Sequence, residues 1–305
     1  MNRRFILGSG IVGLLARHIL GPGWKIIPFG RSRFYSFNPA LANNYFIYHE
    51  DLNEIMTSLI QDTKPLYYQR AYSYNGELIF SDESFAKLGY IHKVFGEHAH
   101  PAAQLLVRSS SIIYKSTVTS VYDYLMNKYK SEISKSIHEW GNLEKISDHT
   151  LKMENGTFEY DYIISTIPLD ALYEYVGQYK ELPYRDVWYY HVETPRLDFE
   201  GASEVLVCDA PYDFYRVDRV GRIEYVFHCL KDLGNPYKYL GAFTNNDIKI
   251  IAHTSMKKAF PIGVPPSTKD LEDKHIYPVG AHAQWDVFMD ISSCIKRLIK
   301  LNLNE

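Results

Sequence analysis

The segment FILGSGIVGLLARHIL, residues 5–20, combines a short apolar run, a glycine-rich turn and a helical pattern. Its apolar start, Phe5 to Leu7, is typical of a short buried strand, and Leu14 to Leu20 follow a helical pattern. In a Gly-x-Gly-x-x-Gly turn of this kind, the first glycine turns the chain, the second admits a pyrophosphate, and the third lets helix and strand pack closely. The phosphate then meets the free amides of the helix N-terminus. The sequence therefore predicts a dinucleotide site at Gly8, Ser9, Gly10, Ile11, Val12 and Gly13.

A second strand is expected at Lys25 to Phe29, after the turn at Gly21-Pro22-Gly23. An acidic residue normally follows such a strand and holds the ribose hydroxyls of the cofactor. The run Gly30-Arg31-Ser32-Arg33 stands there instead. Arginine at this place suits the 2′-phosphate of NADP. The candidate cofactors are therefore FAD, which we prefer, and NADP. Gly30, Arg31 and Ser32 are the candidate contacts in this segment.

The composition is that of a globular protein. A chain of 305 residues with 46% hydrophobic and 23% charged residues excludes disordered and fibrous classes and is long enough for two domains. The net charge of −3, without blocks of like charge, does not indicate nucleic-acid binding, although a local basic groove is not excluded. The three cysteines lack the spacing of a zinc site or a disulfide framework, so we expect no metal site and a reducing compartment.

The residues Arg3-Arg4 and the apolar run from Phe5 to Ala16 imitate a secretory or twin-arginine signal. Three glycines interrupt this run, and no cleavage site of the Ala-x-Ala kind follows. No other apolar stretch approaches the ~18 residues that span a bilayer. We therefore expect a cytoplasmic protein without a membrane span, and the sequence leaves its oligomeric state open.

Two further motifs lie later in the chain. In LKMENGTFEYDYIISTIP, residues 151–168, the Asn155-Gly156 pair predicts a hairpin turn, and a buried strand follows that ends in Thr166 and Pro168. The segment IYPVGAHAQWD, residues 276–286, precedes a predicted helix that starts near Met289. Alternating residues at 188–192, 204–207 and 224–228 predict strands of an antiparallel sheet.

Together these three motifs resemble the flavin amine oxidase superfamily, which includes monoamine oxidases, protoporphyrinogen oxidases and UDP-galactopyranose mutases. In that family an aspartate, an apolar strand and Thr-x-Pro lead the chain from the flavin domain into the substrate domain, as NGTFEYDYIISTIPL would here. The third motif is similar to the closing segment of the mutase-like branch, where Pro-x-Gly-Arg-x-x-x-Trp precedes a helix under the flavin. In this chain His282 replaces that arginine.

The resemblance implies an α/β fold: a Rossmann-like FAD-binding domain with an inserted α+β substrate domain that carries an antiparallel sheet. The FAD-binding domain would comprise residues 1–45, 110–170 and 265–305, and the substrate domain residues 46–109 and 171–264. Short helices are expected at Asp51 to Ile60 and Ser116 to Tyr129, and a strand at Ser131 to Ile137. Further cofactor contacts are then expected at Ile133, Thr166, Gly280, Met289, Asp290 and Ile291.

The function that the resemblance implies is an FAD-dependent oxidoreductase, which oxidises a substrate amine by hydride transfer to flavin N5. His282 and Trp285 would be catalytic residues beside the flavin, and Tyr212, Tyr215 and Arg216 would bind the substrate, with the arginine pairing an anionic group. That substrate is expected to be a small molecule, or an amine attached to a sugar or nucleotide. Two alternatives stay open: a UDP-galactopyranose-mutase-like flavoenzyme acting on a sugar nucleotide, and a non-catalytic nucleotide-binding protein of the same fold.

Overall fold

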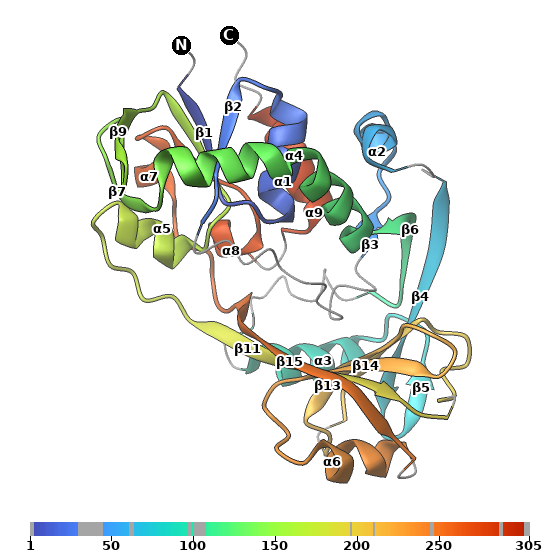
Figure 1. Ribbon diagram of the computed structural model, residues 1–305. Coiled ribbons are helices and arrows are strands. Elements are labelled where there is room, and N and C mark those ends of the chain that lie inside the picture. Colours follow the sequence, from blue (N-terminus) through green and yellow to red (C-terminus); the bar gives the residue numbers. More distant parts are fainter. Residues whose placement is uncertain are drawn as a thin grey trace.

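The computed structural model describes residues 3–29, 45–60, 64–96, 99, 108–195, 197–209, 211–244, 247–286 and 289–301. These residues form two lobes, each organised around its own sheet (Figure 1). The chain passes from the first lobe to the second and back more than once, so each lobe combines distant parts of the sequence.

A parallel sheet forms the centre of the first lobe, with the strand order β16, β10, β1, β2. Its strands are β1 (Arg4–Leu7), β2 (Trp24–Ile27), β10 (Tyr162–Ser165) and β16 (Ile276–Pro278). Ile6 and Ile164 belong to the hydrophobic cluster on one face, whereas Phe5, Leu7 and Ile163 belong to the cluster on the other. Both faces are therefore buried, as is usual for a parallel sheet.

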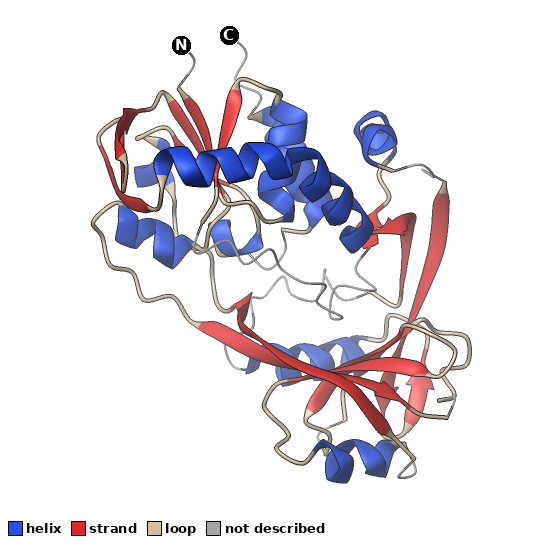
Figure 2. Ribbon diagram, viewed as in Figure 1, coloured by secondary structure: helices blue, strands red, loops and turns tan. Residues whose placement is uncertain are grey.

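Long helices cover one face of this sheet and smaller elements cover the other (Figure 2). The first face carries α1 (Ile11–Leu20), α4 (Val118–Trp140) and α9 (Ile291–Lys300). The second carries α5 (Leu169–Tyr175), α7 (Lys269–Glu272), α8 (Ala281–Gln284) and a three-stranded antiparallel sheet of β7 (Leu143–Ser147), β8 (Thr150–Met153) and β9 (Gly156–Glu159). The predicted turn at Asn155-Gly156 joins β8 and β9.

A second, nine-stranded sheet forms the other lobe, in the order β15, β11, β14, β13, β12, β4, β6, β3, with β5 beside β4. Its strands are β3 (Tyr45–Ile47), β4 (Pro65–Tyr74), β5 (Glu77–Ile79), β6 (Ser110–Thr117), β11 (Tyr184–Glu193), β12 (Glu204–Val207), β13 (Phe214–Arg219), β14 (Glu224–Cys229) and β15 (Lys249–Pro261). All neighbours pair antiparallel except β12 and β4, which are parallel.

Side chains alternate between the two faces of this large sheet. Leu206 lies in the hydrophobic cluster that includes α3 (Ser84–Phe95), whereas Val205 and Val207 lie in the cluster that includes Leu240 of α6 (Pro236–Phe243). The chain returns to this sheet after Thr166-Ile167-Pro168, through α5 and then β11. The α/β class, with a parallel-sheet lobe and an antiparallel-rich second lobe, is the fold expected from the sequence.

Two expected elements differ from the structure. Residues 131–137 are part of α4 and not a strand, because α4 continues without a break from Val118 to Trp140. The expected helix at residues 51–60 is shorter: a 3₁₀ turn at Glu50–Leu52 leads into α2 (Asn53–Leu59). Strand β6, which we assigned to the FAD-binding domain, pairs with β4 and β3 of the large sheet, and the domain boundaries stay a prediction.

Candidate functional site

The predicted glycine turn joins the carboxyl ends of two neighbouring strands. Gly8 follows β1 with φ = +106°, and a Cβ at this position would lie 2.4 Å from Oγ1 of Thr166. The Thr166 hydroxyl, which follows β10, donates a hydrogen bond to the carbonyl oxygen of Leu7 at 2.9 Å. Two residues expected at the cofactor therefore fasten the ends of β1 and β10 together.

The start of α1 is open to an incoming group. Gly10 is exposed at the N-cap, and a Cβ there would meet no atom within 4 Å. No side chain of the described residues caps this helix end, so the amides of its first turn are not occupied by a side chain. Ser9, Ile11 and Val12 are partly exposed beside it. This helix end can receive an anion at the carboxyl edge of the parallel sheet.

The closing segment lies against the same edge. Gly280 is buried and has φ = +120°, and a Cβ built on it would lie 3.7 Å from the side chain of Val12. The amide of the preceding Val279 donates a hydrogen bond to the Ser165 carbonyl at 2.8 Å. Gly280 thus lies next to the glycine turn, with its own surface covered, and its contact with a cofactor stays a prediction.

The start of α9 is capped, unlike that of α1. Oδ1 of Asp290 accepts a hydrogen bond from the Ser293 amide at 2.6 Å. Met289 and Ile291 on either side are partly buried and pack against the hydrophobic cluster under the sheet. Since a carboxylate already meets this helix end, its positive dipole is partly neutralised, and the three residues have only part of their surface open for a cofactor.

One predicted cofactor contact does not reach the site. The adenine contact expected at Ile133 is wrong, because Ile133 is 1% exposed and faces the hydrophobic core from the middle of α4. The contacts at Gly30, Arg31 and Ser32 lie outside the described residues. The described part of β2 and the next two residues, Pro28 and Phe29, contain no acidic side chain for the ribose.

His282 and Trp285 lie at the junction where α8 meets the two strands that connect the lobes. Trp285 is 1% exposed, has φ = +57°, and its indole N–H donates to the Ile262 carbonyl at 2.9 Å. The ring of Tyr184 contacts Trp285 at 4.0 Å between centroids and stacks near His282 at 6.2 Å. His282 Nε2 lies 3.2 Å from the Ala259 carbonyl, which fixes the proton on that nitrogen. Only His282 of this pair has surface that a ligand could touch.

The three predicted substrate residues do not all lie on one face of the large sheet. Tyr212 packs with Phe214 in the cluster on the α6 side of the large sheet, whereas Tyr215 is 2% exposed in the cluster on the α3 side. Arg216 is partly exposed, with 19% of its side chain open.

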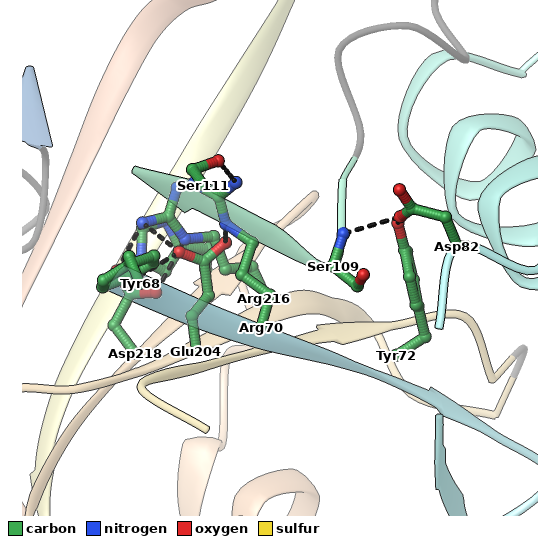
Figure 3. Close-up of polar contacts among 10 residues, drawn as sticks. Tyr68, Arg70, Tyr72, Asp82, Ser109, Ser111, Glu204, Arg216 and Asp218 are labelled. Atoms are coloured by element: carbon green, nitrogen blue, oxygen red, sulfur yellow. Dashed lines mark hydrogen bonds and ion pairs between the residues drawn. The ribbon is translucent and has the colours of Figure 1, made fainter. Parts of the chain in front are cut away.

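A buried polar network surrounds Arg216 (Figure 3). Its guanidinium donates through Nε and Nη2 to the two oxygens of Asp218, at 2.7 and 2.9 Å, and Nη2 lies 3.3 Å from Oε2 of Glu204. On the other side of Glu204, Arg70 Nε donates to Oε1 at 3.1 Å. The Tyr68 hydroxyl also donates to Glu204, at 3.1 Å. Glu204 therefore holds two arginines on its two oxygens. We call these residues and the adjoining histidine the arginine network: Tyr68, Arg70, Glu204, Arg216, Asp218 and His228.

Sheet pairing brings these residues together. Glu204 on β12 is aligned with Arg70 on parallel β4 and with Asp218 on antiparallel β13, and Arg216 is aligned with His228 on β14. Charged residues on adjacent strands and one face form cross-strand pairs. The sequence spacing of Arg216 and Asp218, two residues apart in a strand, was the one signal that could have placed them on a common face.

The charges in the arginine network stabilise one another. Burial alone would raise the pKa of Asp218, but Arg216 and His228 hold it well below its ordinary value. Burial lowers the pKa of His228, despite the neighbouring Asp218 carboxylate at 2.9 Å from Nε2.

A chain of contacts joins this network to the start of α9. The Ser292 hydroxyl donates to the carbonyl of Ile47 on β3 at 2.9 Å. Two residues earlier, the ring of Tyr45 lies 5.4 Å from the ring of Tyr68. These contacts link the network, through β3, to the start of α9.

Other kinds of site are not found in the described part of the chain. Within those ranges, no group of three or more His, Cys, Asp or Glu side chains is placed to hold a metal ion. No described helix combines the length and the apolar character needed to cross a membrane.

Comparisons with known proteins support the fold. No family model matches the chain, and no curated protein matches it in sequence. The structure is similar to that of reduced UDP-galactopyranose mutase, with a TM-score of 0.68 and 14% identity over 99% of this chain and 96% of the other. This chain therefore shares the fold of that structure.

Two further structures show the same fold with lower similarity. An oxidoreductase from Methanosarcina mazei matches with a TM-score of 0.59 and 9% identity, over 97% of this chain and 99% of the other. A flavin-dependent tryptophan C-6 halogenase of taromycin biosynthesis matches with a TM-score of 0.51 and 10% identity, over 98% of this chain and 71% of the other. The fold expected from the three sequence motifs is thereby confirmed.

Proposed function

We propose that the protein is an FAD-dependent oxidoreductase. The observation that carries the proposal is the open N-terminus of α1, at the carboxyl edge of a parallel sheet whose fold is shared with flavoenzymes. Gly8 and Gly13 allow the close approach of strand and helix that brings these amides to the edge.

The residues present fit the pyrophosphate end of FAD better than its ribose end. The amides after Gly10 would hold the phosphates, with Ser9 and Val12 beside them. Met289 and Ile291 would contact the other end of the cofactor, and Asp290 would hold the α9 amides in place. The ribose hydroxyls would lack a carboxylate from the described end of β2. Bound FAD would supply the acceptor for a hydride from the substrate.

We further propose an amine as the substrate, following the resemblance of the sequence motifs. Arg216 would bind an anionic group of that substrate, and the partly exposed His282 would lie near the reacting carbon. Because His282 Nε2 donates to Ala259, this histidine would present its Nδ1 side to the site. Trp285 would hold the Tyr184 ring and so the junction of the lobes, without touching the substrate.

The proposal is tested by an absorption spectrum of the purified protein in the visible range, with chromatography of the chromophore released by acid. We expect the spectrum of an oxidised flavin and release of FAD. Anaerobic bleaching by a panel of amines would support amine oxidation. Turnover of a sugar nucleotide by the dithionite-reduced protein, without oxidase activity, would support the mutase-like alternative.

The non-catalytic alternative makes the opposite prediction. A colourless protein that stays free of flavin after incubation with excess FAD contradicts the proposed function. A rise in melting temperature with NADPH in that same sample would assign the glycine turn to NADP.

A further inference from the structure

The two arginines of the network keep free hydrogen-bond donors. Arg216 uses Nε and Nη2, and Arg70 uses Nε for Glu204 and Nη1 for the Ser111 hydroxyl at 3.3 Å. Within the described residues, Nη1 of Arg216 and Nη2 of Arg70 have no partner, and neither atom is among the buried unsatisfied ones. Each of these nitrogens carries two N–H groups.

The acceptors of the network are used and covered. Both oxygens of Glu204 and both oxygens of Asp218 accept hydrogen bonds, and each of these side chains is 2% exposed. In contrast, 25% of the Arg70 side chain and 19% of the Arg216 side chain are exposed. A ligand group that contacts the free nitrogens of the two arginines therefore meets N–H donors and must itself be an acceptor.

The net charge of the network limits the charge of that acceptor. The two arginines are balanced by two buried carboxylates, so the four groups sum to zero. A ligand anion would be attracted by the guanidinium groups and repelled by Glu204 and Asp218 directly behind them. A second negative charge on the ligand would be repelled by these fixed carboxylates, and the network has no unbalanced positive charge to offset that repulsion. The affinity must therefore come from hydrogen bonds to the guanidinium groups and not from net charge attraction.

We propose that Arg70 and Arg216 bind one carboxylate group of the substrate, and that the balanced charges of the network select a singly charged group against a phosphate or diphosphate. This inference rests on the proposed function, because it names the substrate class of that same site. Arg70 is then a binding residue that the sequence motifs do not indicate, and Glu204 is a positioning residue that sets both arginines and their net charge.

The test is isothermal titration of the full chain with three probes that share one alkyl tail: hexanoate, hexyl phosphate and 1-hexanol. We expect hexanoate to bind about tenfold or more tightly than the other two, in line with the strength of a hydrogen bond to a charged group. Hexyl phosphate bound as tightly as hexanoate, or no binding of hexanoate, would overturn the proposal.

Glu204→Gln is the decisive variant, because it keeps the side-chain shape and gives the network one net positive charge. We expect its preference to shift from hexanoate toward hexyl phosphate; an unchanged preference contradicts the charge argument. If this variant does not fold, Arg70→Gln at a partly exposed position serves instead, with an expected loss of hexanoate binding. Arg222→Gln, in the exposed turn between β13 and β14, removes the same charge outside the network and should bind hexanoate like the native chain.

The flavin content of the same samples separates this inference from the proposed function. A protein without FAD that still prefers hexanoate would contradict the flavoenzyme and keep the carboxylate site. A protein that contains FAD but shows no preference among the probes would keep the flavoenzyme assignment and contradict the carboxylate site.

Discussion

The missing Cβ of Gly13 points at the carbonyl oxygen of Gly8, and a methyl group there would lie 2.1 Å from that oxygen. This contact is where α1 meets the turn after β1. Because the obstructing atom belongs to the backbone, the clash cannot be relieved by a side-chain rotation.

Gly13→Ala should therefore lower the free energy of unfolding by about 3 kcal/mol, at the upper end of the cost of overpacking. The control is Gly23→Ala, where a Cβ meets nothing within 4 Å, and its effect should stay within about 0.5 kcal/mol. Denaturant titration of both variants measures the difference, and equal stabilities would refute the close approach of α1 and β1.

Trp285→Phe distinguishes a structural role from the catalytic role that the resemblance implies. The substitution leaves the Ile262 carbonyl without its buried donor, so we expect a loss of about 1–3 kcal/mol in unfolding free energy. The bound-flavin spectrum should not change, because Trp285 is 1% exposed. A variant with native stability and an altered flavin spectrum would place Trp285 at the cofactor after all.

The lowered pKa of His228 makes stability depend on pH. An unfolded histidine takes up a proton near pH 6.5, whereas the folded protein keeps His228 neutral to lower pH. The unfolded state then binds more protons, so the His228 contribution weakens as pH falls below about 6.5.

Free energies of unfolding measured between pH 7 and pH 5 test this dependence. In His228→Gln, the free energy of unfolding should fall less steeply between pH 7 and pH 5 than in the native chain. In His92→Gln, at an exposed position of α3, it should fall as steeply as in the native chain. The same slope in all three proteins would show that His228 is protonated alike in the folded and unfolded states.

The local parts of the fold were predictable because their signals are contained in short segments. The run from Phe5 to Leu20 predicts β1, the turn and α1, and Asn155-Gly156 predicts the hairpin of β8 and β9. The strand predicted near Ile133 was wrong although the evidence for a helix was present. The buried residues of α4 repeat at helical spacing through that region, at positions 118, 121, 125, 129, 133, 136 and 140.

The arginine network was not predictable in the same way. Arg70 and Glu204 are 134 residues apart and meet only through the parallel pairing of β4 and β12. That register depends on the order of strands in the large sheet, which no short segment encodes. Arg216 was found from its local pattern, but the two carboxylates that neutralise it come from sheet neighbours.

In the proposed function, the first turn of α1 holds the phosphates of FAD. The variant Gly10→Glu tests this role, because the new side chain enters open space and places a carboxylate at the helix start. Gly23→Glu is the matched control, since its site is equally open but lies at the turn before β2. The measurement is the FAD bound per chain after incubation with FAD, with melting temperatures recorded alongside. We expect Gly10→Glu to weaken FAD binding by about tenfold or more through like-charge repulsion, with native melting of the apoprotein, and Gly23→Glu to bind FAD like the native chain. Equal FAD content in all three proteins would contradict the assignment of this helix end to the cofactor.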